Sequence, residues 1–278
     1  MPLMLFHTTE MTSVQQEALQ QRLGGPLSQR EGHWRMAVEK RPDAAELAAL
    51  REEYPFDINP VPEGFDPAAV GLFISDMDST LISIECIDEV ADFAGRKAEV
   101  ARVTEAAMRG EIGFEESLTQ RVQALTGLDE SALEQVYAER LRLNPGGEAL
   151  LAGCDERDIP TAVVSGGFTY FTDRLQRDFG INYAEANVLE IDDGRLSGRV
   201  LGTIVGAEKK RDFLQGLCRK LGITPDQAIA AGDGANDLLM LEQAGIGVAY
   251  RAKPKVQAQC DVVLNHSGLD AILHFLEI

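Results

Sequence analysis

The chain has 278 residues and 45% of them are apolar, which is enough for a substantial core in one large domain or two smaller ones. Its 45 acidic side chains against 26 basic ones give a formal charge of −19. Non-specific nucleic-acid binding needs a basic surface, so we expect no nucleic-acid partner. Any anionic ligand must bind at a locally positive site, because the chain as a whole repels it.

The cysteines and the N-terminus indicate a cytoplasmic protein. The four cysteines are widely spaced and form no Cys-x-x-Cys pair, which fits a reducing compartment and gives no zinc pattern. The first residues do not join a basic segment to an apolar one, so we expect no signal peptide. No apolar run approaches the roughly 18 residues that span a bilayer, so we expect no membrane partner.

Residues 1–68 are predicted to form a small α+β module of β-α-β-α order. Its expected elements are an apolar run at 1–7, a helix at 12–23, a strand at 33–39, a helix at 43–53 and a Pro- and Asp-rich linker at 54–67. Nothing in this segment has catalytic spacing. We expect His7 and His33 to be structural or exposed.

From Gly71 the chain alternates between predicted strands and helices, which indicates an α/β fold with a Rossmann-like parallel sheet and helices on both faces. A long helical region without a convincing strand interrupts this alternation after the first strand. We predict a core made of residues 69–81 and 146–278, and a helical cap at 82–145 that covers the end of the strand.

Three predicted strands end in polar turns that contain glycine or paired acids: Asp76-Met77-Asp78-Ser79-Thr80, Ser165-Gly166-Gly167 and Gly232-Asp233-Gly234-Ala235-Asn236-Asp237. Each pattern alone is also typical of an ordinary turn. In a parallel sheet, however, the carboxyl ends of the strands share one edge, where ligands bind. We therefore expect the three turns to lie together.

Four carboxylates would meet at this edge, from Asp76, Asp78, Asp233 and Asp237. Four crowded acids cannot all stay ionised unless a cation is present. Oxygen ligands without nearby His or Cys favour Mg²⁺, which also bridges to phosphate groups. The pattern predicts an Mg²⁺ site.

The remaining residues of the edge fit phosphate chemistry. Ser165 and its two glycines would expose backbone N–H groups at the start of a helix, which is a suitable cradle for an anion. Lys209 and Lys210 lie at the start of another predicted helix and could neutralise phosphate charge. Asp76 could then attack phosphorus. Asp78 could protonate the leaving oxygen and afterwards activate water.

These motifs resemble those of the haloacid dehalogenase superfamily, and the chain is similar in particular to its phosphoserine phosphatases. The signature Asp-x-Asp-x-Thr matches Asp76 to Thr80, the second motif matches Ser165, the lysine motif matches best at Lys210, and the acidic motif matches Asp233 and Asp237. The resemblance spans roughly residues 70 to 250. It implies an aspartyl-phosphate intermediate on Asp76 and Mg²⁺ held by Asp76, the backbone carbonyl of Asp78 and Asp233.

The resemblance also implies how the substrate O-phosphoserine is bound. Glu85 would bind its ammonium group, Arg121 its carboxylate, and Phe114 would line the pocket. Ser165, Gly166, Asn236 and Lys210 would contact the substrate or its phosphate. Thr80, Gly167 and Asp237 would support the site, with Asp237 behind Lys210 and the cation. Without the resemblance, Glu85 and Arg121 are ordinary exposed helix residues.

Three alternatives remain open from the sequence. The chain could act on another small phosphomonoester, transfer the phosphoryl group to an acceptor, or bind an amino acid without catalysis. The N-terminal module lies outside the resemblance and could sense an amino acid, form a homodimer or only pack against the core.

Overall fold

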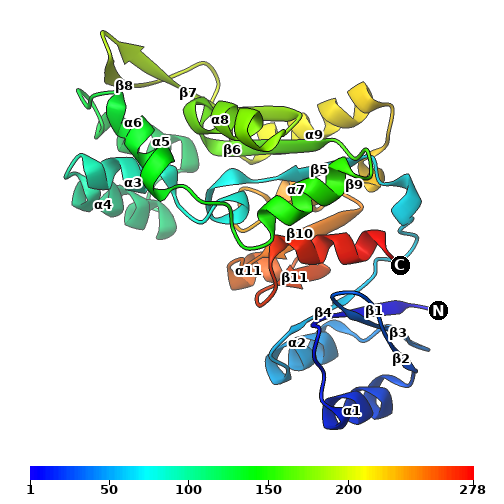
Figure 1. The fold of residues 1–278 in the computed structure, drawn as a ribbon. Helices are drawn as coiled ribbons and strands as arrows, with labels where there is room; N and C mark the ends of the chain where they lie inside the picture. The colour runs from blue at the N-terminus through cyan, green and yellow to red at the C-terminus, as the bar shows by residue number, and fades with distance from the viewer.

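The structure contains a small N-terminal module and a larger core with a helical insert (Figure 1). This computed structural model describes the backbone of residues 1–278 and the side chains of all of them except Met108. A four-stranded sheet has the order β2-β3-β1-β4, and a seven-stranded sheet has the order β11-β10-β9-β5-β6-β7-β8. None of the described helices combines the length and the apolar character needed to cross a bilayer.

The N-terminal module packs two helices on an antiparallel sheet. Its elements are β1 (Leu3–His7), α1 (Ser13–Leu23), β2 (Leu27–Gln29), β3 (Trp34–Ala37), α2 (Ala44–Glu53) and β4 (Asp57–Pro60). Both predicted helices are confirmed, and Thr12 caps α1 by accepting a hydrogen bond from the Gln15 N–H. The apolar side chains of the sheet and helices form a separate core, which includes Met4, Phe6 and Ile58.

The predicted order of this module is wrong at two strands. β2 and β4 were missed, and β4 lies within the segment predicted to be a linker. The sequence of β4, Asp-Ile-Asn-Pro, is poor in strand formers, and proline is tolerated only at strand ends and sheet edges. β4 is an edge strand, and its pairing with β1 decides its conformation.

The core sheet confirms the predicted α/β fold. It consists of β5 (Leu72–Ser75), β6 (Thr161–Phe168), β7 (Tyr183–Asp192), β8 (Arg195–Leu201), β9 (Ala228–Gly232), β10 (Ile246–Tyr250) and β11 (Val262–Leu264). All neighbouring strands pair in parallel except β7 and β8, which form an antiparallel hairpin. β5 lies between β6 and β9, so the strands that follow it are added first on one side, from β6 to β8, and then on the other, from β9 to β11. Ligands bind at such a switch point.

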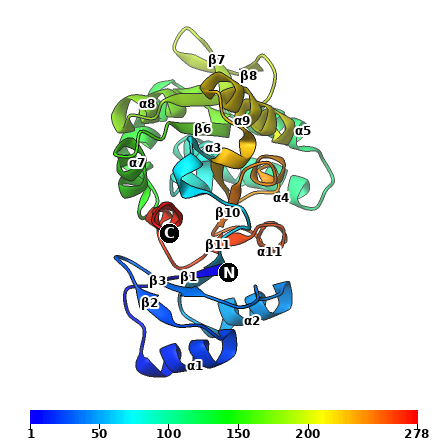
Figure 2. The ribbon, with the colours of Figure 1, turned by 90° about the vertical axis from the view of Figure 1, so that its right-hand side faces the viewer.

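Helices cover both faces of this sheet (Figure 2). One face packs against α7 (Gly147–Asp155), α8 (Thr169–Phe179) and the C-terminal 3₁₀ helix (Leu269–Leu276). The other packs against α9 (Ala207–Leu221), α10 (Leu238–Leu241) and α11 (Pro254–Gln257). Side chains of β5 alternate between the two cores, with Phe73 in one and Leu72 and Ile74 in the other. Short 3₁₀ turns lie at Pro67–Ala69 and Pro225–Gln227.

The insert after β5 is helical, as predicted. It comprises α3 (Cys86–Phe93), α4 (Lys97–Met108), α5 (Phe114–Gln123), α6 (Ser131–Gln135) and a π-helical turn at Val136–Arg140. Its two ends are joined by a bridge between Ile82 and Leu143. The Asn144 amide closes this neck by donating hydrogen bonds to the carbonyls of Thr80 (2.8 Å) and Ile82 (3.0 Å).

The far side of the insert is tied to the β7–β8 hairpin. Backbone hydrogen bonds join Gly127 N–H to the Leu196 carbonyl (2.8 Å), Leu196 N–H to the Leu128 carbonyl (2.8 Å) and Glu130 N–H to the Gly194 carbonyl (2.9 Å). The insert is therefore attached to the core at both its neck and its outer end.

The N-terminal module is joined to the core at β11. The Asn59 side chain donates to the Val263 carbonyl (2.9 Å) and accepts from the Val263 N–H (2.8 Å). It therefore satisfies backbone groups at an edge of the large sheet. The Asp57 carboxylate accepts hydrogen bonds from the N–H groups of Asn265 (2.8 Å), His266 (3.1 Å) and Ser267 (2.7 Å).

Three histidines meet at this junction. The Nδ1 atoms of His7 and His274 lie 2.9 Å apart, and the His274 ring stacks on His33 with 4.4 Å between centroids. Burial lowers the pKa of all three, to about 4 for His274, where the neighbouring His33 adds to the effect. The charges of His274, His33 and Arg51 lower the pKa of His7 further. The predicted structural role of His7 and His33 agrees with this packing.

We predict that the histidine cluster makes the fold acid-sensitive. Each histidine has a lower pKa when folded than its unfolded value of about 6.5, so the unfolded chain binds more protons below that pH. Stability should therefore fall as the pH drops from about 6.5 to 4, and the drop should be smaller in His274→Gln. Urea unfolding at several pH values measures this. His266→Gln, at an exposed position, is the control with the wild-type slope. Equal slopes for wild type and His274→Gln would contradict the prediction.

Candidate active site

One cavity lies at the carboxyl ends of β5, β6, β9 and β10 and is covered by helices of the insert. Its walls include most of the residues predicted for the site, namely Asp76, Asp78, Glu85, Phe114, Arg121, Ser165, Gly166, Gly167, Asp233 and Asn236. The other three, Thr80, Lys210 and Asp237, are buried and contact its lining residues. The structure thus brings all thirteen predicted residues together.

The buried Lys210 ammonium lies between two carboxylates. Its Nζ atom is 2.8 Å from Asp76 Oδ1 and 2.6 Å from Asp237 Oδ1, and the lysine side chain is fully buried. Lys210 comes from the first turn of α9, Asp76 from the end of β5, and Asp237 from the residue before α10. This contact fixes three separate segments at the base of the cavity.

Burial and charge set the protonation of this group. Burial and Asp237 raise the pKa of Asp76 well above its ordinary value, while Lys210 opposes the rise. Burial lowers the pKa of Lys210, but the charges of Asp237 and Asp76 outweigh burial and raise it above the ordinary value. Lys210 therefore remains a cation, and its charge favours the ionised form of Asp76.

The hydrogen bonds of Asp76 all fall on one of its oxygens. Asp76 Oδ1 accepts from the Met77 N–H (2.7 Å) and contacts Lys210. Among the residues that the structure describes, no donor is bonded to Oδ2. The carboxylate is therefore held in place while one oxygen remains available at the cavity.

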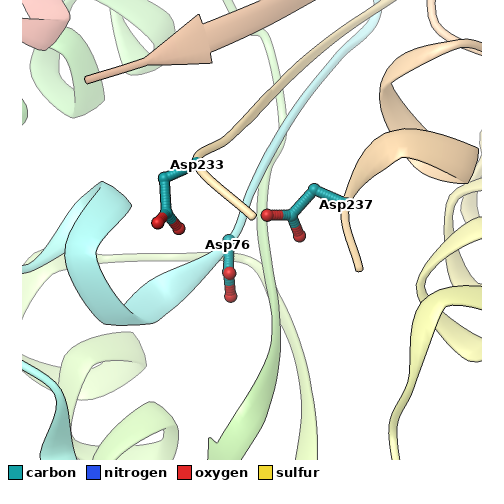
Figure 3. Close-up of side chains that lie close together, drawn as sticks. All are labelled: Asp76, Asp233 and Asp237. Carbon is teal, nitrogen blue, oxygen red and sulfur yellow. The ribbon is translucent and has the colours of Figure 1, made fainter. Parts of the chain in front are cut away.

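Carboxylate oxygens of Asp76, Asp233 and Asp237 lie within 4.8 Å of one another (Figure 3). Asp237 is already engaged, because its Oδ1 accepts from Lys210 and its Oδ2 accepts from the Gly234 N–H (2.9 Å). Among the side chains that the structure describes, the one hydrogen bond to the Asp233 carboxylate is a long one from Thr80 Oγ1 (3.3 Å). Asp76 and Asp233 are thus the carboxylates with free oxygens. A pair of hard oxygen donors of this kind fits a divalent cation.

Burial and the charges of Asp237 and Glu85 together raise the pKa of Asp233 to about 6, against the opposing charges of Lys210 and Lys253. Burial and the neighbouring acids therefore both disfavour the ionised form of Asp233. A bound cation would offset the repulsion between these acids.

Asp78 points toward the insert. Its Oδ1 accepts a hydrogen bond from the Cys86 N–H at the start of α3 (2.9 Å), and its Oδ2 lies 3.4 Å from Ser165 Oγ. Burial and the charge of Glu85 raise the pKa of Asp78 to about 7, although its bond from Cys86 lowers it. Near neutral pH, Asp78 can therefore both give and take a proton.

The Ser165–Gly167 segment differs from the prediction. We expected a turn at the start of a helix, but β6 continues through Phe168 and α8 begins at Thr169. Glycine is needed at positions 166 and 167 because the Phe114 and Asp78 side chains lie close to the backbone there. An added Cβ on Gly166 would lie 2.9 Å from the Phe114 ring, and one on Gly167 would lie 2.6 Å from Asp78 Oδ2. The Gly167 N–H is bonded to Ser165 Oγ (2.8 Å), so this N–H is not free for an anion.

Three residues of the insert and its neck form the other side of the cavity. Glu85 precedes α3 and accepts a hydrogen bond from Ser79 Oγ (2.6 Å). Phe114 begins α5 and is 38% exposed, although it is a large apolar side chain. Arg121 lies on α5, and its Nε is buried without a hydrogen-bond partner among the described residues. A buried guanidinium N–H without a partner is costly, which indicates a place for a ligand acceptor.

Sequence reasoning missed several residues of the site. Ile87 and Leu118 add apolar surface to the cavity wall, and Lys253 adds a cation. The available signal for Lys253 was its position after β10, because the carboxyl end of this fourth parallel strand lies at the same edge of the sheet. Ser79, which adopts a left-handed φ of 57° and holds Glu85, had no signal in the sequence.

We predict that Lys210→Met destabilises the protein strongly at neutral pH. The substitution leaves Asp76 and Asp237 buried without their cation, and breaking a buried ion pair typically costs about 3–5 kcal/mol. Urea unfolding measures this loss. Lys209→Met is the matched control, because its partly exposed ion pair with Glu185 should contribute about 1 kcal/mol or less. Equal stabilities of the two variants would show that Lys210 does not hold the base of the site.

Comparison with known proteins identifies the family. Residues 70–245 match the model of the haloacid dehalogenase-like hydrolases. A phosphoserine phosphatase of Polaromonas sp. is 53% identical over 211 residues, which are 74% of this chain and 89% of the relative. A haloacid dehalogenase family hydrolase of Salmonella enterica serovar Typhi superimposes with a TM-score of 0.91 at 32% identity, covering 99% of this chain and 98% of its own. A probable phosphoserine phosphatase of Vibrio cholerae superimposes with a TM-score of 0.86 at 36% identity, covering 99% and 86%. The chain belongs to the haloacid dehalogenase-like hydrolase family.

Proposed function

We propose that the chain is a phosphoserine phosphatase, a phosphoric monoester hydrolase that converts O-phospho-L-serine and water to L-serine and phosphate. The observation that carries this proposal is one cavity with a phosphate-transfer end at Asp76 and an amino-acid end at Arg121. Of the relatives named above, the Polaromonas protein is named a phosphoserine phosphatase and the Vibrio cholerae protein a probable one.

In the first step, an oxygen of the Asp76 carboxylate attacks phosphorus, and the bond from phosphorus to the serine oxygen breaks. Asp78 gives its proton to that serine oxygen, and L-serine leaves. Lys210 favours the ionised form of Asp76 against the effect of burial and orients the carboxylate for the attack. A pKa of about 7 leaves a large fraction of Asp78 protonated at neutral pH, as this step requires.

In the second step, the ionised Asp78 takes a proton from water. The water oxygen attacks phosphorus of the aspartyl-phosphate, the bond to the Asp76 oxygen breaks, and phosphate leaves. The free carboxylate of Asp76 and the protonated Asp78 are restored. One residue therefore serves as acid and then as base.

We propose Mg²⁺ as the cofactor, held by Asp76, Asp233 and the backbone carbonyl of Asp78. It would supply positive charge to the phosphate oxygens, which is the main requirement of phosphoryl transfer. Thr80 orients Asp233 through its hydrogen bond, and Asp237 supports Lys210 and Gly234. Hard oxygen donors without His or Cys favour this cation.

We assign the ends of the substrate by charge. The forked Arg121 guanidinium suits the substrate carboxylate, and Glu85 suits its ammonium group. Phe114 covers the carbon chain between them. Ser165, Gly166 and Asn236 line the phosphate end. Residues 82–145 act as the substrate-binding cap on a core of residues 69–81 and 146–278, with residues 1–68 as a separate module. A cytoplasmic location and a homodimer stay predictions.

We predict that Arg121→Ala lowers kcat/KM for O-phosphoserine by roughly 10- to 100-fold, because hydrogen bonds to a charged group contribute about 1.5–3 kcal/mol. Hydrolysis of p-nitrophenyl phosphate, which has no carboxylate, should change little. Removal of divalent metal with EDTA should abolish turnover of both substrates, and added Mg²⁺ should restore it.

The control for this experiment is Arg102→Ala, an exposed arginine of the same insert that does not line the cavity. It should keep wild-type kinetics. If the wild type turns over other phosphomonoesters but not O-phosphoserine, the substrate assignment is wrong and the hydrolase chemistry remains. If EDTA has no effect, the metal proposal is wrong.

A further inference from the structure

The cavity walls carry more negative than positive charge. Four carboxylates line it, from Asp76, Asp78, Glu85 and Asp233, against two cations, Arg121 and Lys253. The chain as a whole has a formal charge of −19. A phosphomonoester carries up to two negative charges at neutral pH, so the protein opposes its approach unless a cation lies at the entrance.

Lys210 does not meet this need. It is fully buried, and two carboxylates lie within 2.8 Å of its Nζ atom. Their charges offset its own, so little positive potential reaches the entrance. Arg121 is on α5 at the amino-acid end of the cavity and is assigned to the substrate carboxylate.

Lys253 is placed differently from Lys210 and Arg121. It follows β10 and precedes Pro254, the first residue of α11. Its backbone is extended (φ −63°, ψ 149°), as expected for a residue before proline, and its N–H donates to the Asp233 carbonyl (3.4 Å). This position holds the lysine beside the loop that carries Asp233 and Asn236.

The Lys253 side chain is exposed and still lines the cavity. In the described part of the chain, no carboxylate lies within ion-pair distance of its ammonium group. No ion pair with a described residue offsets the charge of Lys253, which therefore acts on the solvent and the cavity.

We propose that Lys253 is the phosphate-capturing residue of the cavity, which attracts the doubly charged phosphate group of the substrate to the Asp233 side of the entrance. This inference rests on the proposed function for its natural substrate, but it applies to any phosphomonoester dianion. Lys253 acts on the approach and binding of the phosphate and takes no part in the bond changes at phosphorus.

The physical consequence is a dependence on salt. Attraction between exposed charges is screened over about 10 Å at 0.1 M ionic strength. Loss of the Lys253 charge should therefore matter most at low salt, whereas loss of a contact within the closed site would be nearly independent of salt.

The test compares Lys253→Gln, Lys253→Arg and Lys255→Gln. Lys255 is an exposed lysine two residues further on that does not line the cavity, so it is the matched control. With Mg²⁺ present, we would measure kinetics with p-nitrophenyl phosphate and O-phosphoserine from low to high salt, and the affinity for inorganic phosphate by calorimetry.

Lys253→Gln should lower kcat/KM by roughly five- to twentyfold at low salt through KM, leave kcat within about twofold, and weaken phosphate binding by a similar factor. The effect should shrink as salt is added. Lys253→Arg should retain most of the wild-type affinity, and Lys255→Gln should match wild type.

The inference is wrong if Lys253→Gln binds inorganic phosphate as tightly as Lys255→Gln does, or if it lowers kcat with KM unchanged. These results differ from a failure of the proposed function, which would appear as a wild type that does not hydrolyse O-phosphoserine. Binding of inorganic phosphate tests Lys253 in that case too.

Discussion

The site depends on one buried ion pair network, in which Lys210 lies between Asp76 and Asp237. The buried carboxylates of Asp76, after β5, and Asp237, before α10, would repel one another, and the fully buried ammonium group offsets that repulsion. The network also joins β5, α9 and the turn before α10. The same contacts therefore fix the positions of three segments and favour the ionised form of Asp76 against the effect of burial.

The division of tasks follows from the topology. In the proposed function, the core supplies the reacting carboxylates and the cation site at the switch point of its sheet, and the insert supplies the groups that recognise an amino acid. The two parts are linked at the site itself, because Ser79 of the core turn holds Glu85 and the Cys86 N–H of α3 holds Asp78. The two residues proposed for ammonium binding and proton transfer, Glu85 and Asp78, are thus both positioned by residues of the segment 79–86.

The sequence predicted the parts of the site that come from local patterns. Asp76, Ser165 and Asp233 could be predicted because parallel strands bring their carboxyl ends together. Contacts between distant segments could not be predicted in this way. β4 forms because β1 pairs with it, despite a sequence of Asp, Asn and Pro, and the histidine cluster joins residues more than 200 positions apart. Lys253 resembles any exposed lysine until β10 places it at the cavity.

The central claim is that Asp76 becomes phosphorylated during turnover. The most direct test is to quench the wild-type enzyme with acid during hydrolysis of O-phosphoserine and to map the phosphorylated peptide by mass spectrometry. The account predicts phosphate on Asp76, with more of it in Asp78→Asn, because that variant lacks the base for the second step. Phosphate on another residue, or none on the protein while product forms at the usual rate, would contradict it.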